Sequence, residues 1–327
     1  MHKIKQKPED FIVEEIPKLD LKKFGDYTYF LLEKTNWTTR NAIKALARRF
    51  KINEKRFNIA GNKDKNAITK QYVSVYKIGK KGLENVRIKD INIKFIGFGD
   101  ERLKLGQTNG NKFNITIRNL EKKYKKISLF PNYYDDQRFG GKNHLIGKAF
   151  VKKDFKEACD ILKLNYEGKD YIGALRKLDR WLLRFYLNAY QSFLFNEALK
   201  ELIKKRYDYT FEADYTLGYL IFPKDSIYLN IDIPIASYNT IFNNKEIESI
   251  YKNILEKEEI NLEDFKIPQM PELVSETVYR KGFVKLKQAK LSYENDELNQ
   301  GMLKAKFSFI LPPGCYATIA IKACFSN

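Results

Sequence analysis

One carboxylate is set apart by the residues around it. Asp64 lies between Lys63 and Lys65 in a polar stretch, residues 61–66, which follows a short apolar run and precedes a strand-like alternation. The stretch opens with Gly61, a residue type that tolerates the backbone angles of a tight turn. An acid close to cations tends to stay ionised, and an ionised carboxylate at a strand edge can serve as a nucleophile or general base. On spacing alone, a solvated surface turn is the simpler interpretation.

A second group of functional side chains lies in residues 130–141. Proline, asparagine and glycines mark this stretch as a loop, yet it carries the rings of Tyr133 and Tyr134 and the guanidinium of Arg138. Loops that hold large rings and a guanidinium are often built to bind a partner. The alternative is that the rings pack into the core, and the sequence leaves both interpretations open.

The charge of the chain indicates a polyanionic partner. Its 327 residues include 60 Lys and Arg against 41 Asp and Glu, which gives a net charge of +19. Contacts from Lys and Arg to phosphates dominate the affinity of proteins for nucleic acids, so a nucleic acid is the expected partner. A Lys-rich surface can also reflect genome composition or adaptation to heat. The chain is long enough for one large domain or two of ordinary size.

The cysteine and histidine counts argue against several kinds of chemistry. Cys159, Cys315 and Cys324 lack metal-ligand spacing and cannot all pair, which favours a reduced, intracellular setting. The two histidines, His2 and His144, are too few for most zinc sites, and only His144 lies within the body of the chain, which argues against a Ser-His-Asp hydrolase. The N-terminus lacks the apolar core of a signal peptide, and no run of about 18 apolar residues could span a membrane. We therefore expect a soluble, cytoplasmic protein. We also expect a monomer, because no stretch has the pattern of a coiled coil or a dimer face.

The periodicity of apolar side chains predicts the elements that hold these residues. Strands are predicted at residues 11–16, 26–33, 72–76, 91–98, 112–118, 215–223, 283–291 and 303–310. Helices are predicted after Thr38 or Thr39 and over residues 152–164, 170–206 and 245–257, with a last helix after residue 315. This order, strands then helices then strands, indicates a domain inserted into the chain. The C-terminal strands would then complete the N-terminal sheet.

Four segments carry a known pattern in a fixed order. They are residues 8–15 (PEDFIVEE), 61–71 (GNKDKNAITKQ), 132–134 with 137–140 (NYY and QRFG), and 311–318 (LPPGCYAT). Together they resemble the TruD family of RNA pseudouridine synthases, and the second is similar to that family's catalytic stretch, Gly-x-Lys-Asp-x-x-Ala-x-Thr-x-Gln. Residues 190–196 also resemble the family. Because the segments keep their order from residue 8 to 318, the match is specific.

The resemblance implies a fold and an activity. The fold would be α+β, with a pseudouridine synthase catalytic domain that has a mixed, mainly antiparallel sheet and flanking helices. This domain would comprise residues 1–154 and 291–327, and a family-specific α/β domain would be inserted at residues 155–290. The activity would be isomerisation of a uridine in tRNA, typically uridine 13, without a cofactor or metal. Asp64 would be the catalytic aspartate.

The resemblance also implies a set of substrate-binding positions. Tyr134 matches the ring that stacks on the base. Lys63, Lys65 or another nearby cation such as Arg138 could keep Asp64 ionised. The full set is Phe11, Lys63, Asn132, Tyr134, Arg138 and Tyr316. Two departures from the family keep a stacking face and add a hydroxyl, because Tyr134 and Tyr316 stand where Phe is common. A third is unexplained by the sequence: Asp135 and Asp136 replace residues that are often small.

Two other functions are consistent with the basic composition. A non-catalytic RNA-binding or chaperone protein would use its Lys and Arg side chains alone, and Asp64 would then be dispensable. A methyltransferase would need a glycine-rich nucleotide loop between a strand and a helix, and the sequence has none in that context. The first of these remains the alternative to a pseudouridine synthase.

Overall fold

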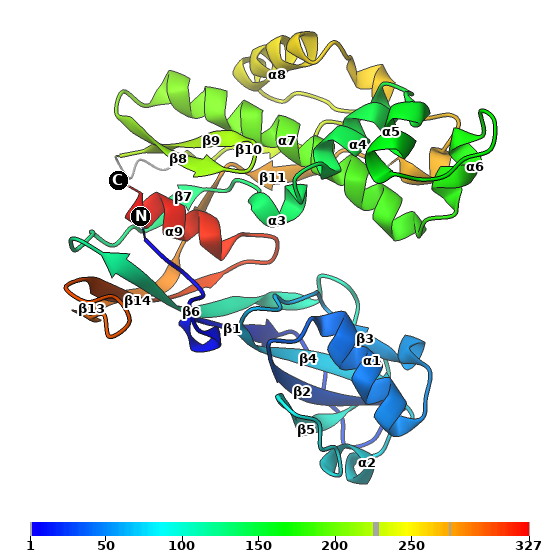
Figure 1. The fold of residues 1–327 in the computed structure, drawn as a ribbon, viewed down its shortest axis with the longest axis vertical. Helices are drawn as coiled ribbons and strands as arrows, with labels where there is room; N and C mark the ends of the chain where they lie inside the picture. Colours follow the sequence, from blue (N-terminus) through cyan, green and yellow to red (C-terminus); the bar gives the residue numbers. More distant parts are fainter. Residues whose placement is uncertain (1, 225–228, 275, 327) are drawn as a thin grey trace. The chain divides into compact units, whose positions relative to one another are not determined.

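The computed structural model describes residues 2–224, 229–274 and 276–326. Packing divides the chain into two compact units, Met1–Ser128 with Leu286–Gly314, and Leu129–Lys285 with Cys315–Asn327. We refer to them as the first and second unit (Figure 1). These packing boundaries are distinct from the predicted limits of the inserted domain, 155–290 within a catalytic domain of 1–154 and 291–327, which stay a prediction.

The first unit is built on one large sheet. Its strand order is β13-β14-β6-β1-β4-β2-β5, with β3 paired to β4 (Figure 1). The strands are β1 (Phe11–Pro17), β2 (Tyr27–Thr35), β3 (Phe57–Ile59), β4 (Ile68–Tyr76), β5 (Ile91–Gly99), β6 (Thr108–Leu120), β13 (Lys287–Asn295) and β14 (Leu303–Leu311). The helices of this unit are α1 (Thr39–Phe50) and α2 (Lys80–Glu84).

The sheet is mixed but mainly antiparallel. Only β1 and β4 run parallel among the pairs of this sheet in the described chain, with Val13 opposite Thr69. The C-terminal strand β14 pairs antiparallel with β6, so that Phe309 lies opposite Phe113, and the two rings stack with centroids 5.6 Å apart. The prediction that the tail completes the N-terminal sheet is therefore confirmed, as is the α+β class.

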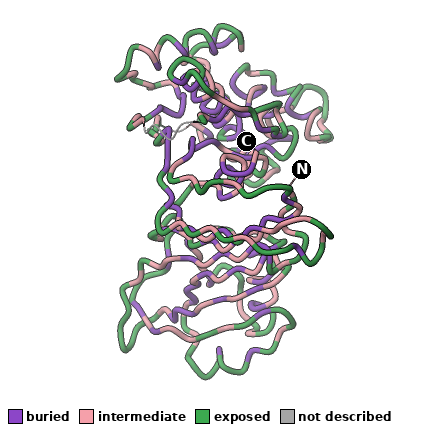
Figure 2. Tube along the Cα trace, turned by 90° about the vertical axis from the view of Figure 1, so that its left-hand side faces the viewer, coloured by how far each residue is buried: buried purple, intermediate pink, exposed green. Residues whose placement is uncertain are grey.

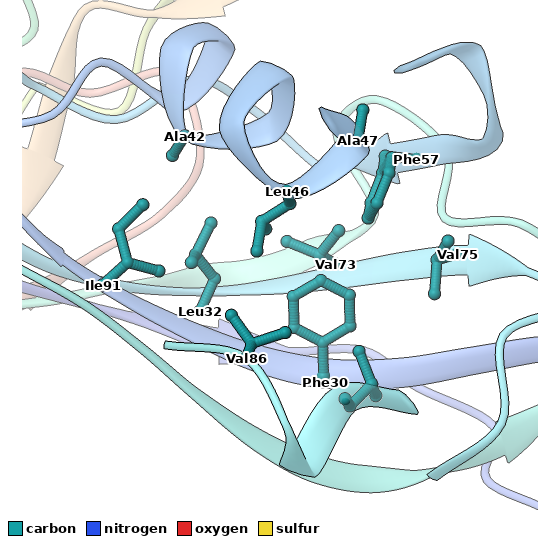
Figure 3. Close-up of a cluster of buried hydrophobic side chains, with 11 residues drawn as sticks. Phe30, Leu32, Ala42, Leu46, Ala47, Phe57, Val73, Val75, Val86 and Ile91 are labelled. Atoms are coloured by element: carbon teal, nitrogen blue, oxygen red, sulfur yellow. The ribbon is translucent and has the colours of Figure 1, made fainter. Parts of the chain in front are cut away.

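Helix α1 covers one part of this sheet because its apolar residues repeat at helical spacing. Thr38 caps the helix by accepting a hydrogen bond from the Asn41 amide, which decides between the two predicted caps. Figure 3 shows Leu46 pointing from α1 toward Leu32 and Val73 of the strands, and all three side chains are fully buried. Burial of one such side chain contributes about 1.5–3 kcal/mol. The cluster fixes α1 against the strands of the sheet.

A buried ionic cluster holds the N-terminal segment against the sheet. Arg118 of β6 donates to Asp10 through Nε at 3.0 Å and Nη2 at 2.8 Å, and to Asp296 through Nη1 at 2.8 Å. Burial opposes ionisation of Asp296, but hydrogen bonds from the amides of Asn119 and Leu298 and from other neighbours outweigh it and lower its pKa to about 2. Lys3 also pairs with Arg118 through the main chain, so the segment before β1 is held to β6 at Lys3 and at Asp10.

The second unit is mainly helical, and its longest helix is α7. The helices are α3 (Asp136–Phe139), α4 (Asn143–Val151), α5 (Phe155–Leu162), α6 (Tyr171–Arg176), α7 (Arg180–Arg206), α8 (Lys245–Lys257) and α9 (Ala317–Phe325). The short strands are β7 (Leu129–Pro131), β8 (Thr210–Tyr215), β9 (Gly218–Pro223), β10 (Asp232–Pro234), β11 (Tyr279–Lys281) and β12 (Phe283–Lys285). They pair as β8 with β9, β10 with β11, and β7 with β12.

Three predicted elements differ from the structure. The predicted loop at 130–141 contains the end of β7 and the short helix α3. The predicted strand at 215–223 contains the last residue of β8, a turn at Thr216 and Leu217, and the whole of β9. Gly218, which has a positive φ of 111°, follows this turn and helps the chain to reverse. The predicted strand at 283–291 is divided between β12 and β13, which pair with different partners. Figure 2 shows how exposed residues gather in the connections between elements.

Candidate active site

Asp64 lies in the connection between β3 and β4 and forms an ion pair there. The Lys5 ammonium is 2.8 Å from Asp64 Oδ2, and the two side chains are 21% and 25% exposed. The pair joins the N-terminal segment to a turn 59 residues away. Spacing could not have revealed Lys5, because its partner is distant in the sequence. We call Lys5, Phe11, Lys34, Lys63 and Asp64 the carboxylate cluster.

Phe11 lies under the Lys5 ammonium. The Nζ atom of Lys5 is 4.1 Å from the centroid of the Phe11 ring, within the range of a cation–π interaction. Phe11 is the first residue of β1, and its ring also packs edge-on against Phe113 at 6.3 Å. The structure therefore brings Phe11 and Asp64 together through a shared lysine, although the Phe11 ring itself is only 3% exposed.

A second lysine binds the Asp64 backbone from inside the protein. Lys34 of β2 is fully buried, and its ammonium donates to the main-chain carbonyls of Asp64 at 2.8 Å and Trp37 at 2.6 Å. Burial lowers the pKa of Lys34 from its ordinary 10.5 to about 8, despite the opposing attraction of Asp64. A buried lysine is rare unless it is well hydrogen-bonded. Within the sequence of β2, Lys34 looks like an ordinary polar residue of a strand, so this role could not be predicted from the sequence.

Lys63 holds the same turn through its side chain and its amide. Its ammonium is 3.0 Å from Glu15 Oε1, and both side chains are largely buried. The other oxygen of Glu15 accepts a hydrogen bond from the Tyr72 amide at 2.8 Å. The Lys63 amide donates to Thr39 Oγ1 at 3.0 Å. The residue predicted as a partner of Asp64 thus connects the turn to β1 and to α1.

The rest of the turn is held by Gln71 of β4. Its Nε2 donates to the Gly61 carbonyl at 3.2 Å, and its Oε1 accepts from Thr39 Oγ1 at 2.8 Å. Gln71 and Thr39 are buried. Gly61 tolerates the angles of a tight turn but does not adopt them here, because its φ is not positive and a Cβ built there would meet no atom of the described chain within 4 Å. Side-chain hydrogen bonds, rather than glycine geometry, shape this turn.

The second unit gathers the other predicted residues around Tyr134. The guanidinium carbon of Arg280 lies 4.2 Å from the centroid of the Tyr134 ring, and that of Arg138 lies 5.2 Å from it. The rings of Phe195 and Tyr316 pack edge-on against Tyr134 at 5.5 Å and 6.0 Å. A half-buried ring with two guanidinium groups close to it suits a site for a planar, electron-rich ligand. We call Asn132, Tyr134, Arg138, Arg280 and Tyr316 the aromatic cluster.

Asn132 fixes Arg280 in place. The Nη2 group of Arg280 donates to Asn132 Oδ1 at 2.7 Å, and its Nε donates to the Asn132 carbonyl at 3.0 Å. Asn132 in turn donates through Nδ2 to the Lys281 carbonyl at 3.0 Å. Arg280 was missed by sequence reasoning, because it lies 148 residues from Asn132 and outside the matching segments. Only the pairing of distant strands brings the two together.

Asn196 of α7 clamps the backbone of Tyr134. Its Oδ1 accepts from the Tyr134 amide at 2.9 Å, and its Nδ2 donates to the Tyr134 carbonyl at 2.8 Å. Asn196 is fully buried. It closes the stretch 190–196, whose resemblance to a family carried no role at the sequence level. The structure gives it one, since the pair of hydrogen bonds fixes the backbone from which the Tyr134 ring projects.

Asp135 and Asp136, the two acids that the sequence left unexplained, pair with other side chains of the second unit. Lys322 of α9 lies 2.8 Å from Asp135 Oδ1 and 3.2 Å from Asp136 Oδ2. Asp136 also accepts from the amide and hydroxyl of Thr216 at 2.7 and 2.8 Å. Although burial opposes its ionisation, these bonds and Lys322 lower the pKa of Asp136. Both acids therefore brace α3 within the second unit, and Lys322 offsets their charge.

The described residues lack two further kinds of feature. No group of three or more His, Cys, Asp or Glu side chains in this part of the chain is arranged to hold a metal ion. Among its helices, none combines the length and the apolar character needed to cross a membrane.

The chain is similar to proteins of one family along its length. A family model described as tRNA pseudouridine synthase D (TruD) matches residues 2–167, 160–217 and 224–323. The chain is 32% identical to "Probable tRNA pseudouridine synthase D" of Nanoarchaeum equitans, with 99% of this chain and 98% of that protein aligned. It is 28% identical to tRNA pseudouridine synthase D of Aquifex aeolicus, again with 99% and 98% aligned.

A solved structure is similar to this one as well. The crystal structure from Methanosarcina mazei that carries the TruD name superposes with a TM-score of 0.72 at 26% sequence identity. The comparison covers 99% of this chain and 93% of that chain. The similarity therefore extends through both compact units.

Proposed function

The chain belongs to the tRNA pseudouridine synthase D family, and we propose from this premise that it isomerises a uridine of tRNA to pseudouridine with Asp64 as the catalytic carboxylate. The observation that carries the proposal is the Lys5–Asp64 ion pair, in which a partly exposed carboxylate is held at 2.8 Å by a cation. It lies within the segment that matches the family's catalytic pattern. Asp64 is the acid in that segment that follows Lys63.

The proposed reaction needs a positioned carboxylate and does not need an electron donor or acceptor. Pseudouridine forms when the N1–C1′ bond breaks, the base turns, and C5 bonds to C1′. The proton leaves C5 and N1 gains one, so atoms and electrons balance without a redox partner. An ionised carboxylate can attack C1′ or C6, or remove the 2′ proton, and each route starts from the same charged form of Asp64. Lys5 and Lys34 hold that group by its side chain and by its backbone.

The aromatic cluster has the chemistry of a base-binding site. An enzyme that acts on a base must take it out of its stack and hold it on another surface. Tyr134 offers a ring that Arg280 and Arg138 polarise, and Tyr316 packs beside it. We assign stacking of the uracil to Tyr134, and contacts with the substrate to Phe11, Lys63, Asn132, Arg138 and Tyr316.

The position of the modified uridine in the tRNA is part of the proposal. The resemblance of residues 61–71 and 311–318 to the family supports uridine 13 as the target. Uridine 13 is tested with tRNA transcripts in which that one residue is cytidine. We also propose that the protein acts as a monomer, which sedimentation equilibrium measures directly.

Tritium release tests the chemistry. A tRNA transcript labelled with tritium at uracil C5 is incubated with the wild type, with Asp64→Asn, and with Asp100→Asn as a matched control. Asp100 is an exposed acid of the same unit and also pairs with a lysine, Lys22. We expect release with the wild type and the control and none with Asp64→Asn, because the amide cannot act as a nucleophile or base.

The outcomes separate the two functions. Release that persists in Asp64→Asn would remove Asp64 from the catalytic role. Release that fails even in the wild type, together with tight binding that weakens steeply with salt, would favour the non-catalytic RNA-binding protein. Carbodiimide mapping of the product then locates the modified uridine.

A further inference from the structure

An exposed tryptophan lies on α7, outside the residues assigned above. Trp181 is 62% exposed, whereas large aromatic side chains are mostly covered in folded proteins. Its indole stacks on Phe185, one helical turn further along, with centroids 5.7 Å apart and planes at 20°. Such a pair adds only slightly to the stability of a helix. That small gain leaves the exposure of a large apolar surface unexplained.

The stacked pair is continuous with the aromatic cluster. The guanidinium carbon of Arg138 lies 5.5 Å from the centroid of Phe185 and 5.2 Å from that of Tyr134. One guanidinium therefore joins two rings, and a row of π contacts runs from Trp181 through Phe185 and Arg138 to Tyr134. All four residues belong to the second unit. The row ends in solvent at Trp181.

Two arginines beside Trp181 are held in fixed directions. Arg184 donates through Nε to the carbonyl of Glu272 at 2.8 Å, and Arg180 donates to the same carbonyl through Nε and Nη2 at 3.3 and 3.1 Å. Both side chains are exposed, and neither forms a salt bridge within the residues that the structure describes. A carbonyl orients a guanidinium without neutralising it. The positive charge therefore remains available to an anion.

We propose that Trp181 and Phe185 form a stacking platform for an unpaired base of the RNA other than the target uridine, with Arg180 and Arg184 contacting its backbone phosphates. The platform rests on the proposed function for the identity of the RNA. Proteins recognise unpaired RNA through aromatic faces and arginine planes combined with phosphate contacts, which is the chemistry gathered here. The positive charge of the two arginines complements a phosphate backbone and opposes an apolar protein partner.

Binding of an unlabelled tRNA transcript tests the platform. The dissociation constant is measured by filter binding for the wild type, Trp181→Ala and Trp181→Phe, with Tyr209→Ala as control. Tyr209 is 68% exposed in the same unit. We expect Trp181→Ala to raise the dissociation constant by about 5- to 100-fold, Trp181→Phe to restore most of the affinity, and the control to stay within twofold. Turnover at saturating RNA should be unchanged in Trp181→Ala, since the platform binds and does not react.

The arginines are tested by salt dependence. Each lost phosphate contact lowers the slope of log K against log salt by about 0.7 to 0.9. Arg184→Gln should show this loss, whereas Arg206→Gln should not, because Arg206 lies at the far end of α7 and already pairs with Glu246. An unchanged slope in Arg184→Gln would remove the phosphate contact from the proposal.

Failure of the platform and failure of the proposed function give different results. Equal binding by Trp181→Ala and the wild type would overturn the platform, whatever the tritium assay shows. Absence of tritium release by the wild type, with binding that still depends on Trp181, would refute the enzyme and retain the platform. Fluorescence gives an independent readout in a Trp37→Phe variant, which leaves Trp181 as the single indole of the chain. Binding of the tRNA transcript should quench the fluorescence of Trp181.

Discussion

Lys34 donates a hydrogen bond of 2.8 Å to the main-chain carbonyl of Asp64 from a fully buried position in β2. A charged ammonium in the interior costs free energy, and hydrogen bonds to two carbonyls offset part of that cost. The arrangement fixes the backbone on which the carboxylate stands. It also couples the stability of the first unit to pH.

Stability should rise with pH because of Lys34. Its pKa is about 8 in the folded protein and about 10.5 in the unfolded chain, so between these values the unfolded chain binds more protons. The free energy of unfolding of the wild type, relative to Lys34→Met, should therefore increase from pH 8 to 10.5, by up to about 3 kcal/mol. Below pH 8 the difference should be flat. Urea unfolding of both proteins across this range measures it.

Lys70→Met serves as the control for this pH dependence. The hydrogen bond to Glu14 raises the pKa of Lys70 in the folded protein, so its contribution is lost only as the pH rises above 10.5. No increase relative to Lys70→Met is expected between pH 8 and 10.5. A rise of equal size in both comparisons would show that another group titrates.

Two buried threonines should respond differently to the same substitution. Thr39→Val removes the hydroxyl that binds the Lys63 amide and Gln71, so it should destabilise the protein by about 1–3 kcal/mol and slow turnover by about 10- to 100-fold. Thr69 is equally buried, but its hydroxyl has no partner among the residues that the structure describes. Thr69→Val should be neutral or stabilising by about 1 kcal/mol. Thermal unfolding of both variants measures the two changes in stability. Equal losses of stability would contradict the role of the Thr39 hydroxyl in the hydrogen-bond network.

Removal of the Lys5 ammonium should impair catalysis. Lys5→Met breaks the ion pair with Asp64 and uncovers the Phe11 ring, and a charge-assisted hydrogen bond contributes about 1.5–3 kcal/mol. We expect kcat to fall by about 10- to 100-fold and Lys5→Arg to recover part of it. Lys7→Met is the control, since Lys7 makes only a 4.0 Å exposed contact with Glu297 among the salt bridges of the described chain. Tritium release at saturating tRNA gives all three rates.

Replacement of Arg280 by lysine should impair activity. Its planar fork donates twice to Asn132 and stacks on Tyr134, which an ammonium cannot do. Arg280→Lys should lower kcat/KM by about tenfold or more. Arg56→Lys offers a matched control, because Arg56 donates to the Tyr76 carbonyl and lies 5.8 Å from that ring in the first unit. If both variants lose activity equally, the loss reflects the general difference between the two side chains rather than the aromatic cluster.

Much of the fold was predictable because its signals are local. Apolar periodicity identified most strands of the large sheet, α1 and the whole of α8. Where the prediction was wrong, at β8–β9 and at β12–β13, a continuous apolar pattern concealed a turn or a change of pairing partner. Periodicity records which side chains are buried, but not which strand buries them.

The sequence by itself determined the basic charge, the order of the elements, and the motif in which Asp64 follows Lys63. Only the tertiary structure decided which side chains surround that motif. Lys5 and Lys34 reach Asp64 from 59 and 30 residues away, and Arg280 reaches Asn132 from 148. The tertiary structure also pairs the Lys63 ammonium with the carboxylate of Glu15. The physical reason is that an ion pair depends on distance in space, which the pairing of distant strands sets and which spacing along the chain does not record.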